Sequence, residues 1–255
     1  KLSMNTVTTR KICRHIDGSS EFVDDLVALE KKIRISVNGK EILSLYCTPN
    51  MVREFVVGFM MTEGIIKGNW CAERMSIEYG NEVLVDIPAE GDVSMNGKVI
   101  TSGCVGGVTF EKRTENEPID DKFSIGSDKL REIFNLFQAR SDLYKLTGCI
   151  HSAALSDGEN ILCFAEDIGR HNAVDKVIGY AILENIPFSG KIMLASGRIS
   201  SEISSKCARW GIPMIATRTA PTNLAVEIAE KRGVTIVGFI RGKRFNVYTH
   251  PERIK

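Results

Sequence analysis

The chain has 255 residues and a formal net charge of +1, with 43% hydrophobic and 25% charged residues. This is an ordinary globular balance, and the small net charge gives no reason to expect a nucleic-acid partner or a membrane surface. Apolar runs such as Val234–Ile240 are strand-sized and too short to span a bilayer. The polar segment Lys1–Ser20 has no apolar signal-peptide core, so we expect a cytoplasmic protein.

Residues 1–111 predict a small α+β portion. Alternating apolar residues on both sides of Asn38-Gly39 predict a hairpin over residues 33–46, because Asn-Gly is the strongest short hairpin signal. A second hairpin is expected over residues 76–87. Between the hairpins, apolar residues at helical spacing predict a helix over Val52–Gly64, with the glycine at its C-terminal end.

The charged, proline-bearing start of residues 112–126 is typical of a connector, and residues 127–255 predict an α/β domain. The domain begins with an expected amphipathic helix over Ser127–Tyr144, with Ser127 as its N-cap. Further strands are expected at 150–155, 161–165, 191–196, 213–217, 234–240 and 244–249. Helices alternate with most of these strands, which predicts a mixed sheet with substantial parallel pairing and helices packed on it.

Polar clusters follow four of the predicted strands. They comprise residues 166–172, 196–200, 218–222 and 241–244. Ligands of such sheets bind beyond the carboxyl ends of the strands, so we expect a ligand site where these clusters meet.

The first cluster contains Gly169, Arg170, His171 and Asn172, between a strand and a helix. The glycine allows a turn, Asn172 is expected as N-cap, and a helix N-terminus beside Arg170 and His171 suits a phosphate or another anion. His171 could instead be a proton donor. The alternative for Arg170 is a surface ion pair with Asp175.

Two further clusters offer cations beside a glycine. Gly197 and Arg198 precede a helix that Ser200 is expected to cap, and Arg198 could bind an anion in a bidentate manner. The other cluster comprises Phe239, Ile240, Arg241, Gly242, Lys243 and Arg244. Such a turn suits a diphosphate or a guanine nucleotide, and the alternative is a solvated basic hairpin tip. His151 could face a pocket or be a core histidine.

Cys104 lies among glycines in the segment Thr101–Gly107, one of seven scattered cysteines. No pair has C-x-x-C spacing, so the cysteines favour reduced thiols over a zinc knuckle or a redox dithiol. Backbone N–H groups of a glycine-rich segment can favour the thiolate, the form that attacks a donor persulfide. The alternative is a turn that holds a small apolar residue.

Several long stretches resemble the FdhD family of formate dehydrogenase accessory proteins. They are EDIGRHNAVDKVIG (166–179), SGRISSEISSKCARWGIP (196–213), APTNLAVEIAEKRGVTIVGFIRG (220–242), NVYTHPERI (246–254), VNGKEI (37–42), VREFVVGFMMTEGII (52–66) and TGCIHSAAL (147–155). These stretches keep their order over nearly the whole chain from about Ile33 onward.

The resemblance implies a sulfurtransferase that accepts persulfide sulfur from a cysteine desulfurase. It implies that the sulfur passes to the molybdenum bis-molybdopterin guanine dinucleotide cofactor, which then enters formate dehydrogenase. By the same resemblance, Cys104 stands at the persulfide position, and Phe239–Arg244 stands at the cofactor-binding block. The guanine end of the cofactor is expected against the basic, glycine-rich strand-end loops.

The resemblance also implies a homodimer and a cytidine-deaminase-like three-layer α/β/α sandwich with the small α+β N-terminal portion added. Zinc deamination is not expected, because the chain has Ser152 and Ala153 after His151 and lacks the H-x-E and P-C-x-x-C ligands. We therefore expect no metal ligand. Many bacterial members carry C-x-x-C after Thr-Ser, whereas Gly107 occupies the second position here. The alternative to sulfur transfer is a non-catalytic chaperone for the cofactor.

Overall fold

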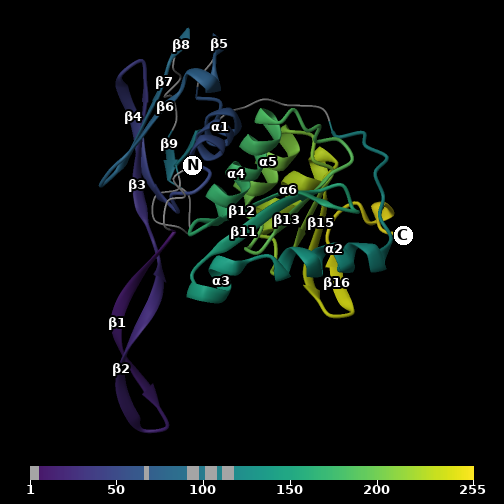
Figure 1. Ribbon diagram of the computed structural model, residues 1–255. Coiled ribbons are helices and arrows are strands. Elements are labelled where there is room, and N and C mark those ends of the chain that lie inside the picture. Colours follow the sequence, from purple (N-terminus) through teal and green to yellow (C-terminus); the bar gives the residue numbers. More distant parts are fainter. Residues whose placement is uncertain (1–5, 66–68, 91–97, 101–107, 111–117) are drawn as a thin grey trace.

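The structure is a computed structural model that describes residues 6–65, 69–90, 98–100, 108–110 and 118–255. Figure 1 shows a small N-terminal sheet, a larger C-terminal sheet and a long two-stranded arm that projects from the body. The N-terminal strands are β1 (Val7–Ile16), β2 (Ser19–Ala28), β3 (Lys31–Val37), β4 (Lys40–Cys47), β5 (Asn69–Trp70), β6 (Ser76–Tyr79), β7 (Val83–Ile87), β8 (Ala89–Glu90), β9 (Lys98–Ile100) and β10 (Val108–Phe110).

The N-terminal sheet has the strand order β4-β3-β7-β6. Asn38 and Gly39 both have positive φ angles, 51° and 75°, as a tight two-residue turn between β3 and β4 requires. The antiparallel pairing of β6 with β7 confirms the second predicted hairpin, and β3 joins the two hairpins by pairing in parallel with β7. Alternate side chains of the strands pack on helix α1 (Val52–Glu63), which ends at left-handed Gly64 as predicted.

Two glycines bring α1 into close contact with helix α4 (Arg170–Leu183). A Cβ on Gly58 would lie 1.8 Å from the Asp175 carbonyl oxygen, and a Cβ on Gly179 would lie 1.8 Å from the Glu54 carbonyl oxygen. Only glycine permits this approach of two helix backbones. The N-terminal portion is thereby packed directly on the C-terminal portion.

The C-terminal sheet is mixed, as predicted, with the order β12-β11-β13-β14-β15-β16. Its strands are β11 (His151–Ser156), β12 (Ile161–Asp167), β13 (Ile192–Ala195), β14 (Met214–Thr217), β15 (Thr235–Arg241) and β16 (Arg244–Val247). β13, β14 and β15 are parallel, and the outer strands are antiparallel to their neighbours. Its other helices are α2 (Ser127–Ala139), α3 (Asp142–Thr147), α5 (Ser201–Arg209) and α6 (Asn223–Arg232). Apolar residues of α4, α5 and α6 form one core with the sheet, and those of α2 form another on its opposite face. No helix in the described ranges is long and apolar enough to cross a membrane.

The helix predicted over Ser127–Tyr144 is in fact two helices, α2 and α3, so that prediction is wrong. The break falls at Arg140 and Ser141, where the Ser141 hydroxyl donates to Glu166 Oε1 at 2.6 Å instead of continuing the helix. Serine competes with helical hydrogen bonding in this way. The predicted cap is also wrong, because Gly126 and not Ser127 is the N-cap residue of α2.

Residues 118–126, within the expected connector, pack along the C-terminal portion. The Asp121 carboxylate accepts from the Ser189 hydroxyl and from the Gly190 N–H, at 2.9 and 2.7 Å. The Arg253 guanidinium also donates to the Asp121 carbonyl oxygen. These bonds fix the entry to α2.

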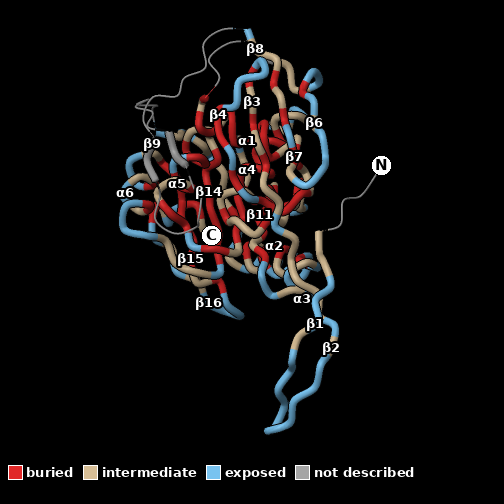
Figure 2. Tube along the Cα trace, turned by 90° about the vertical axis from the view of Figure 1, so that its left-hand side faces the viewer, coloured by how far each residue is buried: buried red, intermediate tan, exposed pale blue. Residues whose placement is uncertain are grey.

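The arm consists of β1 and β2, whose full pairing the polar sequence did not predict. Opposite charges face each other across it, with Arg10 opposite Asp25 and Lys11 opposite Asp24. Figure 2 shows that the arm is mostly exposed, in contrast to the buried interior of the body. Phe22 near its tip keeps 75% of its surface exposed.

Candidate functional site

The expected strand-end clusters gather at one edge of the C-terminal sheet. His151, at the start of β11, pairs with Asp167, at the end of β12. Thr217, at the end of β14, donates from its hydroxyl to the carbonyl oxygen of Gly197, which follows β13, at 2.7 Å. Phe239 N–H then donates to the Thr219 carbonyl oxygen at 2.8 Å. The edge therefore continues from the β12 end to the β15 end.

A buried ion pair organises the turn between β12 and α4. Lys176 Nζ lies 2.7 Å from Asp167 Oδ2, and both side chains are fully buried. Lys176 also donates to the Thr48 carbonyl oxygen, and Thr48 N–H donates to Asp167. Asp167 and Lys176 thus stabilise the turn between β12 and α4, and their bonds to Thr48 attach the N-terminal portion to that turn.

Asn172 belongs to the same structural network. Its Nδ2 donates to Asp167 Oδ1 and to the Tyr46 carbonyl oxygen, at 2.9 and 3.0 Å. The prediction that Asn172 caps α4 is wrong, because the N-cap residue is Gly169, whose N–H also donates to Asp167. The Asp167 carboxylate thus accepts from both the Asn172 amide and the Gly169 N–H. The Asn172 amide is therefore bonded within the protein.

Arg170, only 7% exposed, lies at the centre of the edge. A Cβ on Gly197 would lie 3.2 Å from Arg170 Cβ and 3.3 Å from His151 Nδ1, so a larger residue would crowd both side chains. Burial and the Arg170 charge lower the pKa of His151. Burial, Lys206 and Arg170 lower the pKa of His171 to about 3. Both imidazoles are therefore neutral at neutral pH.

A small pocket of about 250 Å³ lies where α5 and α6 begin. Its lining comprises Arg170, Arg198, Ser200, Ser201, Glu202, Thr222 and Leu224. Ser200 caps α5 as predicted, and Thr222 caps α6. His171 Nε2 lies 2.9 Å from the Ser200 hydroxyl oxygen. The two arginines outnumber the one carboxylate, Glu202, so the lining is cationic on balance. With two helix N-termini beside it, this pocket favours an anion, and we call it the small pocket.

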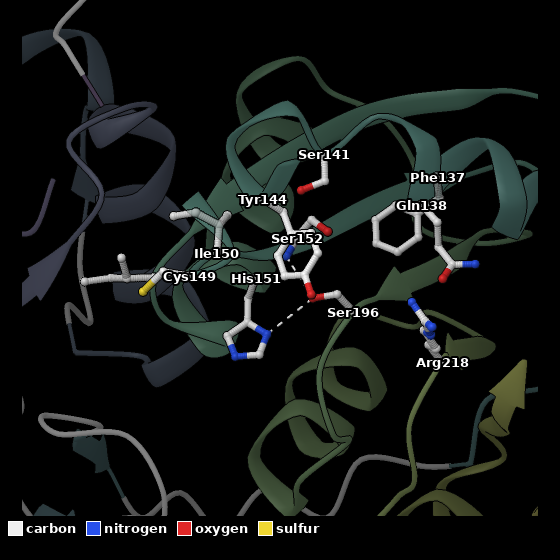
Figure 3. Close-up of a pocket in the computed structure, with 12 residues that line it drawn as sticks. Phe137, Gln138, Ser141, Tyr144, Cys149, Ile150, His151, Ser152, Ser196 and Arg218 are labelled. Atoms are coloured by element: carbon white, nitrogen blue, oxygen red, sulfur yellow. Dashed lines mark hydrogen bonds between the residues drawn. The ribbon is translucent and has the colours of Figure 1, made fainter. Parts of the chain in front are cut away.

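A larger pocket of about 650 Å³, shown in Figure 3, includes Ser196, two residues before Arg198 of the small pocket. Its lining comprises Phe137, Gln138, Ser141, Tyr144, Gly148, Cys149, Ile150, His151, Ser152, Ile168, Ser196 and Arg218. His151 Nδ1 lies 3.3 Å from the Ser196 hydroxyl oxygen, which in turn accepts from Ser152 N–H at 2.9 Å. We call this cavity, with its aromatic rings, hydroxyls and one exposed arginine, the large pocket.

The Phe239–Arg244 block divides into a core part and an exposed part. Ile240 is 2% exposed and packs in the core beneath α2. Phe239 has a positive φ of 53° where the pairing of β15 with β16 shifts register. Arg241, whose guanidinium lies 5.6 Å from the Phe239 ring centroid, begins the exposed tip that continues to Arg244. The tip thus presents three exposed cationic side chains, those of Arg241, Lys243 and Arg244.

Cys104 lies outside the described residues. On either side of its segment, β9 and β10 pair antiparallel, with Ile100 opposite Val108. The six cysteines that the structure does describe are free thiols. Burial raises the pKa of Cys47 and Cys163 to about 12 and also raises that of Cys207, so these three stay protonated.

The sequence prediction missed the contribution of α2 and α3 to the site. Phe137, Gln138 and Tyr144 line the large pocket from helices that cover the sheet edge. The helical spacing carried no signal of this, because Tyr144 follows Phe137 by seven residues and so falls on the apolar face of the predicted helix. Cys149, one of the seven scattered cysteines, is an exposed residue of the same pocket. Within the described part of the chain, no three His, Cys, Asp or Glu side chains are grouped to hold a metal ion.

The chain is similar to known proteins over most of its length. The model of the FdhD/NarQ family matches residues 28–255. The chain is 39% identical over 248 residues to a sulfur carrier protein FdhD from Sulfolobus acidocaldarius, covering 96% of this chain and 97% of that protein. It is 36% identical over 253 residues to one from Bacillus pumilus, covering 96% of each.

A solved structure agrees with these sequence matches. It is described as that of a formate dehydrogenase accessory protein from Desulfotalea psychrophila. It is 27% identical, has a TM-score of 0.77, and the match covers 98% of this chain and 100% of the other. Because the family model matches residues 28–255 and the relatives are covered over nearly their full length, the chain belongs to the FdhD/NarQ family.

Proposed function

We propose that this protein is a sulfur carrier that serves formate dehydrogenase, with Cys104 as the sulfur-bearing residue. The observation that carries the proposal is the full-length likeness to proteins named sulfur carrier protein FdhD. The accessory-protein description of the structural relative points to the client enzyme. The high pKa values of the three buried thiols also support Cys104, because those thiols are poor nucleophiles.

In the proposed reaction, the Cys104 thiolate attacks the outer sulfur of a persulfide on a cysteine desulfurase. A sulfur–sulfur bond forms on Cys104, the donor's sulfur–sulfur bond breaks, and the desulfurase cysteine leaves as a thiolate. No net oxidation occurs. Gly107 occupies the family's second cysteine position. The exchange uses only the Cys104 thiol, so it does not depend on a second cysteine there.

The proposed acceptor is the molybdenum bis-molybdopterin guanine dinucleotide cofactor, bound as a substrate at the strand-end edge. Its phosphates are anionic, which suits Arg170, Arg198 and the basic tip Arg241–Arg244. Gly169 leaves room for the Asn172 side chain, and Gly197 leaves room for the Arg170 and His151 side chains. His171 is neutral at this site. Asn172 contributes by holding the turn between β12 and α4, through its hydrogen bonds to Asp167 and to the Tyr46 carbonyl oxygen.

The competing function is a chaperone that binds the cofactor without transferring sulfur. Cys104→Ala separates the two functions when added with cofactor and desulfurase to inactive formate dehydrogenase. Sulfur transfer predicts that the variant binds guanine nucleotide normally but fails to activate the dehydrogenase. Activation at the wild-type level would instead establish chaperoning. Cys149→Ala, an exposed thiol at the large pocket, is the matched control and should activate normally.

The remaining expectations belong to the same proposal. A homodimer is proposed from the family resemblance, and a projecting arm with exposed Phe22 is the kind of element that a second copy can cover. Light scattering on the purified chain tests it. The cytidine-deaminase-like arrangement is supported by helices on both faces of a mixed sheet. Free, scattered thiols support a cytoplasmic location.

A further inference from the structure

The arm is a two-stranded ribbon that the body leaves largely uncovered. β1 and β2 pair along their whole length, and within the described part of the chain no third strand joins either edge. Figures 1 and 2 show the arm extending away from both sheets, with exposed residues along most of its length. An isolated two-stranded hairpin is only marginally stable in water. A partner that covers one face of the arm would therefore stabilise it.

The register of the arm divides its side chains between two faces. Residues directly opposite each other in an antiparallel pair point to the same face, so Cys13 shares a face with Phe22. Side chains two residues further along a strand lie on that face too. We call it the Phe22 face, and it carries Lys11, Cys13 and His15 of β1 with Ser20, Phe22 and Asp24 of β2.

The Phe22 face has both an apolar group and charges that are available to a partner. Phe22 is 75% exposed, more than any other large hydrophobic residue in the described ranges. Lys11 and Asp24 lie opposite each other, yet neither forms an ion pair with any residue that the structure describes. On the other face, Arg14 is paired with Asp25 at 3.6 Å. The Phe22 face is therefore the better docking surface of the two.

The charges of the arm fit a second copy of the same arm. All three Lys and Arg residues of the two strands lie on β1, and all three Asp and Glu residues lie on β2. If two Phe22 faces meet about a two-fold axis parallel to the strands, β1 of each copy lies over β2 of the other, so opposite charges meet. A two-fold axis across the strands would place β1 over β1 and β2 over β2, where like charges repel.

We propose that the Phe22 face is an interface between two copies of this chain, with the arms side by side and their tips pointing the same way. Phe22 packs against Cys13 of the partner subunit, and Lys11 pairs with Asp24 of the partner subunit. The two bodies lie at the same end of the paired arms. This inference rests on the homodimer in the proposed function, and it goes further by naming the face and its arrangement.

Light scattering of the full chain over a dilution series measures the dissociation constant of the dimer. Phe22→Ala should raise that constant at least about tenfold, because each dimer loses two buried aromatic rings. Ile16→Ala is the matched control and should leave the constant unchanged, because Ile16 is 52% exposed on the opposite face of the same arm. Both side chains are exposed in the single chain, so the variants should fold.

A mixing experiment tests the arrangement of the arms. Lys11→Glu and Asp24→Lys each bring like charges together, so each variant alone should dimerise at least about fivefold more weakly. Mixed in equal amounts, the two variants should recover the wild-type dissociation constant. The introduced glutamate then faces the introduced lysine, and native Lys11 faces native Asp24. Like charges remain opposite each other within each chain, so the recovery reports contact between copies.

A dissociation constant that Phe22→Ala and both charge variants leave unchanged would overturn the inference and leave the homodimer to another surface. A mixture that dimerises no better than its components would overturn the arrangement. A wild-type chain that stays monomeric at every concentration would overturn the inference and the homodimer together. Sulfur transfer is tested separately, because the mass of the Cys104 peptide reports it whatever the oligomeric state.

Discussion

At the scale of single residues, much of the charge in the family-like segments is structural. Asp167 and Lys176 form a buried ion pair, and Asp175, which we considered as a surface partner of Arg170, is 1% exposed. Asp175 pairs instead with buried Lys206, at 2.6 Å. The surface-pair interpretation of Asp175 is therefore wrong. Sequence spacing cannot tell a buried charge from an exposed one when its partner lies on another element.

Lys176→Met should destabilise the protein strongly. The substitution leaves the Asp167 carboxylate buried without its cation, which typically costs about 3–5 kcal/mol in the free energy of unfolding. Denaturant titration measures it. Lys129→Met is the control, because Lys129 forms an exposed pair with Glu159 at 2.7 Å and its loss should change little. A Lys176→Met protein as stable as the Lys129→Met protein would contradict the structural role.

Asp175 should make stability depend on pH. Burial raises the pKa of Asp175 from 3.8 to about 6, although the Lys206 charge lowers it. The Glu63 carboxylate, which pairs with the same lysine, also raises the pKa of Asp175. Between these pH values the folded state keeps a proton that the unfolded state has released. Stability should therefore decline as pH rises from about 4 to about 6. Subtracting the curve of Asp175→Asn from that of wild type isolates the decline, and a flat difference would refute it.

At the scale of elements, the sequence predicted the local structure best where one signal dominates. Asn38-Gly39 and Gly64 adopt the positive φ angles expected of a turn and a helix end, so the first hairpin and α1 were predictable. The break between α2 and α3 was not, because it depends on the Ser141 bond to Glu166 on a distant strand. The same long-range dependence hid the contribution of α2 and α3 to the large pocket.

Gly58→Ala should separate α1 from α4. Intrinsic helix propensity alone would favour alanine by about 1 kcal/mol, whereas the new Cβ would lie 1.8 Å from the Asp175 carbonyl oxygen. Overpacking of this kind typically costs about 1–3 kcal/mol, so we expect a lower free energy of unfolding. Thermal denaturation checks the sign. Gly80→Ala, where the nearest atom would lie at 3.6 Å, should be nearly neutral. Stabilisation by Gly58→Ala would show that the helices are not in contact.

At the scale of the whole molecule, buried polar contacts join the two portions around the site. Thr48 bonds Asp167 and Lys176, and Thr62 on α1 donates to Asp175 on α4 at 2.9 Å. The alternation of strands and helices allowed the mixed sheet and the strand-end edge to be predicted. The joining contacts were not predictable, because each links positions more than 100 residues apart, as in the 113-residue separation of Thr62 from Asp175.

The central claim is that Cys104 carries sulfur for the cofactor. Mass spectrometry of the full chain, after anaerobic incubation with a cysteine desulfurase and cysteine, tests it most directly. We predict that the peptide containing Cys104 gains the mass of one sulfur atom, that a thiol reductant removes it, and that Cys149→Ala gains it equally. A Cys104 peptide that never gains sulfur, while the desulfurase is active and persulfidated, would contradict the account.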